Sequence, residues 1–267
     1  MSISSEERKR VIMEQLKQEG QVKVPELSHR FTVSEETVRR DLILLEKEGL
    51  AKRVYGGAVL TKLTSYEPPY LQRQKVKAEE KERIGCAAAE LIESGDTIAI
   101  DIGTTTLEMA KAIAGRERLT ILTNSLAVAY HLMESLNGGR FSGKIFVVGG
   151  ELNPEQQSMS GTIGESILSQ FRVDKAFISI GGISLERGIS DYDVDETGMS
   201  RRMIEAASRT IVLADASKLG KEAFVEIAPL SQVHAIVSDV AAPKEWLQAL
   251  RIHRIQWIEA TNYKGEK

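Results

Sequence analysis

From Asp96 onward, short apolar runs alternate with helical segments, and this alternation restricts the possible folds more than any other feature of the sequence. The strand-like runs are TIAID (97–101), TILTN (120–124), KIFVVGG (144–150), AFISIGG (176–182), TIVLAD (210–215), AIVSD (235–239) and RIQWI (254–258). Strands that alternate with helices form a mainly parallel sheet, because each connection crosses a face of that sheet. The sequence therefore predicts an α/β domain over residues 78–260.

Polar residues and glycines gather at the carboxyl ends of these predicted strands, where ligands of open α/β sheets bind. Each one alone is consistent with a turn, because glycine permits positive φ and aspartate caps helices. Together they predict a binding pocket. Its candidate members are Asp101, Gly103, Thr104, Thr105, Thr106, Thr123, Asn124, Gly149, Gly150, Gly181, Gly182, Asp215, Ser217 and Lys218.

The segment DIGTTT (101–106) is the most informative part of this set. A glycine and three hydroxyls between a strand and a helix offer N–H groups, side-chain donors and a helix dipole to an anion. The segment is neither a P-loop nor a dinucleotide-binding turn, so nucleoside triphosphates and NAD are disfavoured and no cofactor is expected. It predicts a phosphate site, and Lys218 is the candidate cation for it.

The first sixty residues contain three short amphipathic segments. Ser4 and Glu7 have the spacing of a capping box, and the first helix is expected to stop at Gly20. A second helix is predicted from about Val24 to Phe31. After a tight connection, Ser34 is the expected N-cap of the third helix. This arrangement is typical of a helix-turn-helix.

The third predicted helix has an apolar face and a polar face. Val38, Leu42 and Leu45 are expected to point inward, which leaves Glu36, Arg40 and Ile43 on the opposite side with Thr37 and Arg39 beside them. A helix of this kind fits a major groove about 12 Å wide. The candidate DNA contacts are Ser34, Thr37, Arg39 and Arg40. The alternative is a solvated charged face on an ordinary bundle helix.

The segment AKRVYGGAVL (51–60) predicts two short strands joined at Gly56 and Gly57, which would form a wing. Lys52, Arg53 and Tyr55 lie on it and are expected to contact phosphates or the minor groove. The formal net charge of the chain is −3, so a DNA-binding surface has to be local.

The N-terminal segment resembles the DNA-binding domain of the DeoR family of bacterial sugar-operon regulators. The matching residues are Arg8, Ile12, Leu16, Ser34, Thr37, Val38, Arg39, Arg40, Asp41 and Leu42, followed by LEKEGL and RVYGGA. The resemblance implies a winged helix-turn-helix over residues 1–60. Asp41 is expected to pair with an arginine inside the domain, because a carboxylate near phosphates would repel them.

Residues 61–77 lose periodicity and contain SYEPP (65–69), which favours an extended, stiff linker. The run KVKAEEKERIG that begins at Lys75 then predicts an amphipathic helix reaching about Ile92.

Residues 75–258 resemble the effector domain of the DeoR family, which is similar in fold to ribose-5-phosphate isomerase. The resemblance is carried by DIGTTTLEMA, LTNS, VVGGELN, GTIGESIL, DKAFISIGGIS, GISDYDVDE and LADASKLG. It implies that a sugar phosphate contacts Asp101, Thr104, Thr105, Asn124, Gly181, Glu196, Arg201 and Lys218. It also implies a repressor of a carbohydrate-metabolism operon that the phosphorylated sugar releases from its operator.

An isomerase would need a carboxylate that moves a proton between sugar carbons. An ungapped alignment from Asp215 places Ser200 where the isomerase has its glutamate base, and a serine without a neighbouring base cannot do this work. We therefore expect a binder and not an enzyme. The alternative is a bifunctional phosphosugar isomerase in which Glu196, Asp193 or Asp195 substitutes. A purely architectural DNA-binding protein would not need the polar strand ends.

The sequence has no apolar stretch long enough to span a bilayer and no signal-like N-terminus, so we expect a cytoplasmic protein without membrane contact. One cysteine and four scattered histidines predict no metal site. One short recognition helix contacts few bases, so a homodimer or homotetramer on double-stranded operator DNA is expected.

Overall fold

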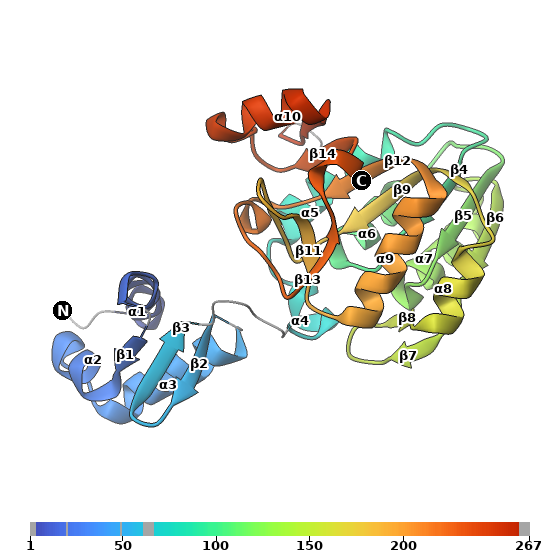
Figure 1. Ribbon diagram of the computed structural model, residues 1–267. Coiled ribbons are helices and arrows are strands. Elements are labelled where there is room, and N and C mark those ends of the chain that lie inside the picture. Colours follow the sequence, from blue (N-terminus) through green and yellow to red (C-terminus); the bar gives the residue numbers. More distant parts are fainter. Residues whose placement is uncertain (1–3, 20, 49, 61–66, 262–267) are drawn as a thin grey trace. The chain divides into compact units, whose positions relative to one another are not determined.

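The computed structural model describes residues 4–19, 21–48, 50–60 and 67–261 (Figure 1). The chain divides into two compact units, residues 1–68 (unit 1) and residues 69–267 (unit 2). None of the helices within the described ranges is both long and apolar enough to cross a membrane.

Unit 1 contains the three predicted helices, α1 (Ser5–Glu19), α2 (Val24–Phe31) and α3 (Glu35–Lys47). The Ser34 hydroxyl caps α3 by accepting a hydrogen bond from the Thr37 amide at 3.2 Å, as the sequence predicts. Val38, Leu42 and Leu45 are buried in a small core that includes residues of all three helices.

The wing contains one strand more than the sequence predicts. Strands β2 (Ala51–Val54) and β3 (Gly57–Leu60) form the expected hairpin, and β1 (Gln21–Lys23) pairs with β3 to give the order β1-β3-β2. An ideal Cβ on Gly57 would lie 2.0 Å from the Val22 carbonyl oxygen, so only glycine allows this approach. Three residues are too short for a period-2 pattern to reveal β1.

The seven predicted strands of unit 2 form one parallel sheet, which confirms the α/β fold. Their order is β15-β14-β12-β9-β4-β5-β6. The bounds are Thr97–Ile100 (β4), Leu119–Thr123 (β5), Gly143–Val147 (β6), Val173–Ser179 (β9), Ala207–Leu213 (β12), Ala235–Ser238 (β14) and Gln256–Glu259 (β15).

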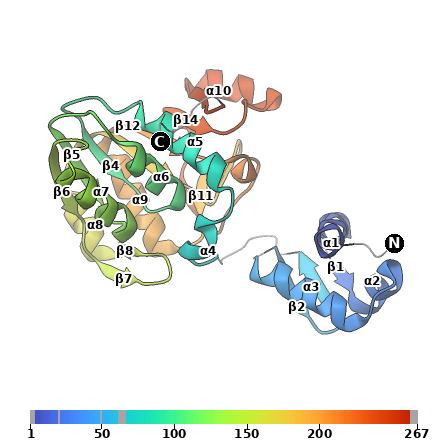
Figure 2. The ribbon, with the colours of Figure 1, turned by 180° about the vertical axis from the view of Figure 1, so that it is seen from behind.

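Helices cover both faces of this sheet, as Figures 1 and 2 show from opposite sides. Helices α5 (Ala78–Ala89), α6 (Thr104–Ala112) and α7 (Leu126–Asn137) pack on the face that presents Ile98 and Ile100. Helices α8 (Thr162–Leu168), α9 (Val194–Ala206) and α10 (Leu247–His253) pack on the face that presents Ala99. Alternate residues of one strand thus enter two separate cores.

Smaller elements lie around the sheet. Strands β7 (Glu151–Asn153) and β8 (Ser158–Ser160) form a hairpin, and β10 (Gly182–Ser184), β11 (Gly188–Asp191) and β13 (Val225–Ala228) form a three-stranded sheet. The described part of unit 2 also contains 3₁₀ turns at Ala216–Lys218 (η1), Leu230–Gln232 (η2) and Lys244–Trp246 (η3).

The predicted linker 61–77 differs from the structure in its second half. Residues 61–66 lie outside the described residues, but Tyr70–Gln74 form helix α4, and unit 2 begins at Pro69. The side chain of Tyr70 is buried, which ties α4 to unit 2. The two prolines predict the extended entry correctly and give no signal for the helical turn after them.

Candidate functional site

The outer face of α3 carries two exposed arginines, each paired within its own helix. Arg39 Nη2 lies 2.6 Å from Glu35 Oε2, and Arg40 Nε lies 3.5 Å from Glu36 Oε1. Exposed pairs one helical turn apart contribute only about 0.3–0.5 kcal/mol. Both guanidinium groups can therefore leave their partners for a stronger acceptor.

A buried ion pair fixes α3 against α1. Arg8 Nε lies 2.7 Å from Asp41 Oδ2, and Arg8 Nη2 donates to Asp41 Oδ1 at 3.2 Å. The Ser5 hydroxyl also donates to Asp41 Oδ1, at 2.6 Å. These contacts confirm that Asp41 pairs with an arginine inside unit 1. They also set the direction in which the outer face of α3 points.

The wing presents cations and one aromatic ring. Arg53 Nε lies 2.6 Å from Glu46 Oε2, so α3 and β2 are joined by this contact. Hydrogen bonds from the Arg53 backbone and side chain lower the pKa of Glu46. Lys52 and Tyr55 are exposed, and Tyr55 stands beside Gly56, whose φ of +79° makes the tight turn.

Asp101 lies at the carboxyl end of β4 and is 1% exposed. Its Oδ2 accepts a hydrogen bond from Ser200 Oγ at 2.8 Å, and its Oδ1 accepts one from the Ile102 amide at 2.8 Å. Burial raises the pKa of Asp101 to about 8; the charge of Asp191 adds to the rise, whereas the hydrogen bonds oppose it. At neutral pH this carboxyl is mostly protonated, so it does not repel an anion.

The expectation that no base lies beside Ser200 is wrong, because Asp101 lies there. The two residues are 99 positions apart and meet only through the fold, so the local sequence could not reveal the contact. A carboxyl that is mostly protonated at neutral pH is still a poor proton acceptor.

The DIGTTT segment ends β4 and begins α6. Gly103 has φ +152°, and an ideal Cβ there would lie 2.3 Å from Ser179 Oγ, so the turn requires glycine. Thr106 Oγ1 donates to the Gly103 carbonyl at 3.0 Å and is therefore engaged within the turn. Thr104 and Thr105 are buried in the first turn of α6, where backbone N–H groups lack helical acceptors.

Thr123 and Asn124 lie at the end of β5, and they differ in which of their side-chain atoms already have hydrogen-bond partners. Thr123 Oγ1 accepts a hydrogen bond from the Ser125 amide at 3.1 Å, which makes it part of the turn. Asn124 Nδ2 donates to the Met159 carbonyl at 3.0 Å, while its buried Oδ1 has no hydrogen-bond partner. A buried acceptor without a donor is destabilising, and a ligand hydroxyl would satisfy it.

Glu196 lies in the first turn of α9 and is buried. Its Oε1 accepts a hydrogen bond from Ser158 Oγ at 2.6 Å and lies 3.4 Å from Asn153 Nδ2. Asp193, three residues before Glu196, caps this helix, and that capping-box spacing could have predicted α9.

Gly181 and Gly182 follow β9 at positions where a side chain would not fit. Ideal Cβ atoms there would lie 2.7 Å from Tyr192 Cε2 and 2.5 Å from the Lys221 carbonyl oxygen. Lys218 Nζ lies 5.9 Å from the Tyr192 ring centroid. Tyr192, which sequence reasoning missed, therefore lies near both Gly181 and Lys218.

Asp215 ends β12, and Lys77 faces it from the start of α5, with Nζ 3.6 Å from Oδ1. Burial would raise the pKa of Asp215, but hydrogen bonds from Ser217 and the charges of Lys218 and Lys77 bring it below its ordinary value. Lys77 is a second cation that no local motif predicts, because it lies 138 residues before Asp215 in the chain.

Two sets of contacts are present among these residues. Strand β8 joins Asn124 to Glu196, and Ser200 Oγ donates to the Glu196 carbonyl and to Asp101 Oδ2. Lys77 and Lys218 lie at Asp215. Arg201 belongs to neither set. It is exposed on α9 and donates to the Glu226 and Ile227 carbonyls of β13. Successive helical residues point about 100° apart, so Arg201 turns away from the face that carries Ser200. Among the residues that the structure describes, no cluster of His, Cys, Asp or Glu could hold a metal ion.

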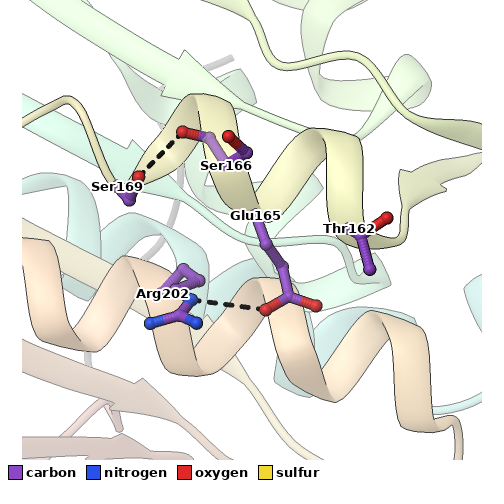
Figure 3. A pocket seen from close by; sticks show the side chains of 5 residues that line it. All are labelled: Thr162, Glu165, Ser166, Ser169 and Arg202. Atoms are coloured by element: carbon purple, nitrogen blue, oxygen red, sulfur yellow. Dashed lines mark hydrogen bonds and ion pairs between the residues drawn. The ribbon is translucent and has the colours of Figure 1, made fainter.

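A separate hollow of about 280 Å³ lies between α8 and α9 (Figure 3). It is lined by Thr162, Glu165, Ser166, Ser169 and Arg202. Arg202 Nε lies 3.3 Å from Glu165 Oε2, so the charges in this hollow compensate each other. None of the strand-end residues lines it.

Comparison with known protein families gives two matches. The DeoR-like helix-turn-helix domain matches residues 8–64, and the DeoR C terminal sensor domain matches residues 76–240.

Similar proteins include the putative aga operon transcriptional repressor of Escherichia coli O157:H7, 35% identical over 92% of this chain and 90% of that protein. The glycerol-3-phosphate regulon repressor of Escherichia coli strain K12 is 36% identical over 92% of this chain and 95% of its own. Among solved structures, a D-ribose-5-phosphate isomerase in complex with phospho-erythronic acid is 17% identical, with a TM-score of 0.39, over 53% of this chain and 54% of that chain.

Proposed function

Because the chain belongs to the DeoR family of helix-turn-helix transcriptional regulators, we propose that it represses a carbohydrate-metabolism operon and leaves its operator when a phosphorylated sugar binds to unit 2. The chain is a transcriptional regulator and not an enzyme, as are the relatives that share most of its length. The phosphosugar isomerase alternative is therefore set aside. A regulator of this kind acts on DNA in the cytoplasm.

One observation carries the sugar-phosphate part of the proposal: the Oδ1 of Asn124 is buried without a hydrogen-bond partner, and strand β8 joins Asn124 to Glu196 through Met159 and Ser158. The first turn of α6 suits a phosphate, because its N–H groups and dipole favour an anion. Asn124, Glu196 and the protonated Asp101 supply acceptors and donors for sugar hydroxyls. The relative named for glycerol 3-phosphate agrees with an anionic polyol.

This assignment is tested by a thermal-shift screen of the full chain with glycerol 3-phosphate, glucose 6-phosphate, fructose 6-phosphate and ribose 5-phosphate. A ligand at 100 times its Kd should stabilise unit 2 by about 2.7 kcal/mol. Equal concentrations of the unphosphorylated compounds serve as the control. If the phosphorylated and unphosphorylated compounds give the same melting temperature, the proposed phosphate site is wrong.

The DNA contacts are proposed for the outer face of α3 and for the wing. If Arg40 reads a guanine edge, Arg40→Ala should weaken binding to a selected duplex by about 1–3 kcal/mol and relax specificity. Lys52→Ala should weaken binding to all DNA sequences alike. It should also reduce the slope of log affinity against log salt concentration by roughly one. Fluorescence anisotropy at several salt concentrations measures both effects. Arg10→Ala, an exposed arginine on α1, is the matched control. Unchanged affinity in both test variants would contradict the assignment.

We propose that the chain acts as a homodimer or homotetramer, because one helix of 13 residues reads too few base pairs for a genomic site. Two copies on a repeated or palindromic site would double the number of base contacts. Light scattering should therefore give a multiple of the 29.5 kDa chain mass, both free and with the duplex. A monomeric mass under both conditions would contradict this proposal.

A further inference from the structure

Helix α4, the first element of unit 2, packs against the turn of the β7–β8 hairpin. The Tyr70 amide donates to the Glu155 carbonyl at 2.9 Å, and the Tyr70 side chain is 1% exposed. Arg73 Nη2 donates to Gln156 Oε1 at 2.7 Å, and the Arg73 guanidinium lies 5.9 Å from the Tyr70 ring centroid. Two consecutive turn residues, Glu155 and Gln156, therefore hold α4.

The same turn is joined to the candidate ligand site through Asn153. Asn153 Oδ1 accepts hydrogen bonds from the Glu155 amide at 3.1 Å and the Gln156 amide at 3.2 Å, which shapes the turn. Asn153 Nδ2 lies 3.4 Å from Glu196 Oε1. One amide side chain thus joins the turn that holds α4 to a carboxylate of the ligand site.

Residues 70–77, which begin with α4, are also held at their C-terminal end, near Asp215. Lys81 Nζ donates to the Arg73 carbonyl at 2.6 Å, and Lys77 pairs with Asp215. Lys77 has a left-handed backbone, with φ +54°, at the start of α5. A non-glycine residue in this conformation is uncommon and persists only where its surroundings fix it. Residues 70–77 are therefore held at one end by the β7–β8 turn, which Asn153 joins to Glu196, and at the other end by Asp215.

We propose that residues 70–77 transmit ligand occupancy to unit 1, with Arg73 and Gln156 as the positioning residues. A ligand that engages Glu196 and Lys218 changes the partners of Asn153 and Asp215, and these residues hold the two ends of the segment. Pro69 caps α4, and unit 1 ends at Pro68. A shift of α4 therefore moves the point at which unit 1 is attached. This inference rests on the proposed function.

The test uses Arg73→Ala and Gln156→Ala in the full chain, with Tyr70→Phe as the matched control. The Tyr70 hydroxyl is buried and has no hydrogen-bond partner, so its removal keeps the packing of α4. The DNA is a duplex selected from random sequence by the wild-type protein. The ligand is the sugar phosphate of the four-compound screen that most stabilises the wild type. Anisotropy measures DNA affinity with and without ligand, and calorimetry measures ligand affinity.

In the wild type and Tyr70→Phe, saturating ligand should weaken DNA binding by about tenfold, within the usual range of allosteric coupling. In Arg73→Ala and Gln156→Ala, this effect should fall to about twofold or less, while ligand affinity and ligand-free DNA affinity stay near the wild-type values. The double variant should match the single variants, because both remove the same hydrogen bond.

If ligand still weakens DNA binding tenfold in both variants, the inference is overturned and the proposed function stands. If none of the four compounds changes the DNA affinity of the wild type, the proposed function fails and the inference fails with it.

Discussion

Asp41→Ala should destabilise unit 1 by about 3–5 kcal/mol, because it leaves the Arg8 guanidinium buried without its carboxylate. A domain of this size has a total stability of only about 5 kcal/mol, so much of unit 1 would unfold and DNA binding would be lost. Hydrogen exchange followed by mass spectrometry measures the effect locally. Amides of α1 and α3 should lose protection, while those of the seven-stranded sheet keep theirs.

Glu14→Ala is the matched control for this experiment. Glu14 also pairs with an arginine, Arg10, but both side chains are more than half exposed. Its removal should cost no more than about 0.5 kcal/mol. If Asp41→Ala exchanges no faster than Glu14→Ala, the buried pair does not hold α3 in place.

Asp101 should make unit 2 less stable as pH rises. Its folded pKa is about 8, whereas an aspartate in an unfolded chain has a pKa near 3.9. Between these values the folded state keeps a proton that the unfolded state has released. The stabilisation is therefore complete below about pH 4 and lost as pH rises to about 8. Between pH 6 and pH 8 the free energy of unfolding should fall by about 2 kcal/mol from this group.

Asp101→Asn removes this titration and keeps an acceptor for Ser200. Urea unfolding followed by tryptophan fluorescence reports unit 2 alone, since both tryptophans, Trp246 and Trp257, lie there. Between pH 6 and pH 8, the free energy of unfolding of the wild type should fall by about 2 kcal/mol more than that of Asp101→Asn. Parallel pH profiles for the two proteins would show that the carboxyl does not titrate in this range.

The features that sequence predicted well are those with a strong local pattern. The seven apolar runs became the parallel sheet, and the helical spacing of Val38, Leu42 and Leu45 identified the inner face of α3. The position of Ser34 before two glutamates is a local signal that predicts a helix cap, and Ser34 caps α3. The internal role of Asp41 followed from electrostatics, without knowledge of which arginine it would meet.

The features that sequence missed depend on long-range contacts. Lys77, Tyr192 and Asn153 reach the site only through the fold. Tyr192 and Asn153 lie in the matching segments GISDYDVDE and VVGGELN, but these segments do not indicate which side chain faces the site. The resemblance predicts Arg201 as a site residue, but its direction on α9 depends on where that helix begins. Thr123 is predicted from its place at a strand end, and its Oγ1 accepts a hydrogen bond from the Ser125 amide within the turn.

A sugar phosphate bound at the strand ends of unit 2 should release the operator DNA from unit 1. The most direct test adds increasing sugar phosphate to a preformed complex of the selected duplex with wild type, Lys218→Ala or Lys144→Ala, and follows the anisotropy. Lys144 is an exposed lysine on β6, so it serves as the matched control. The wild type and Lys144→Ala should release the duplex, while Lys218→Ala should bind it equally well and stay bound. Release of Lys218→Ala at the wild-type ligand concentration would contradict the account.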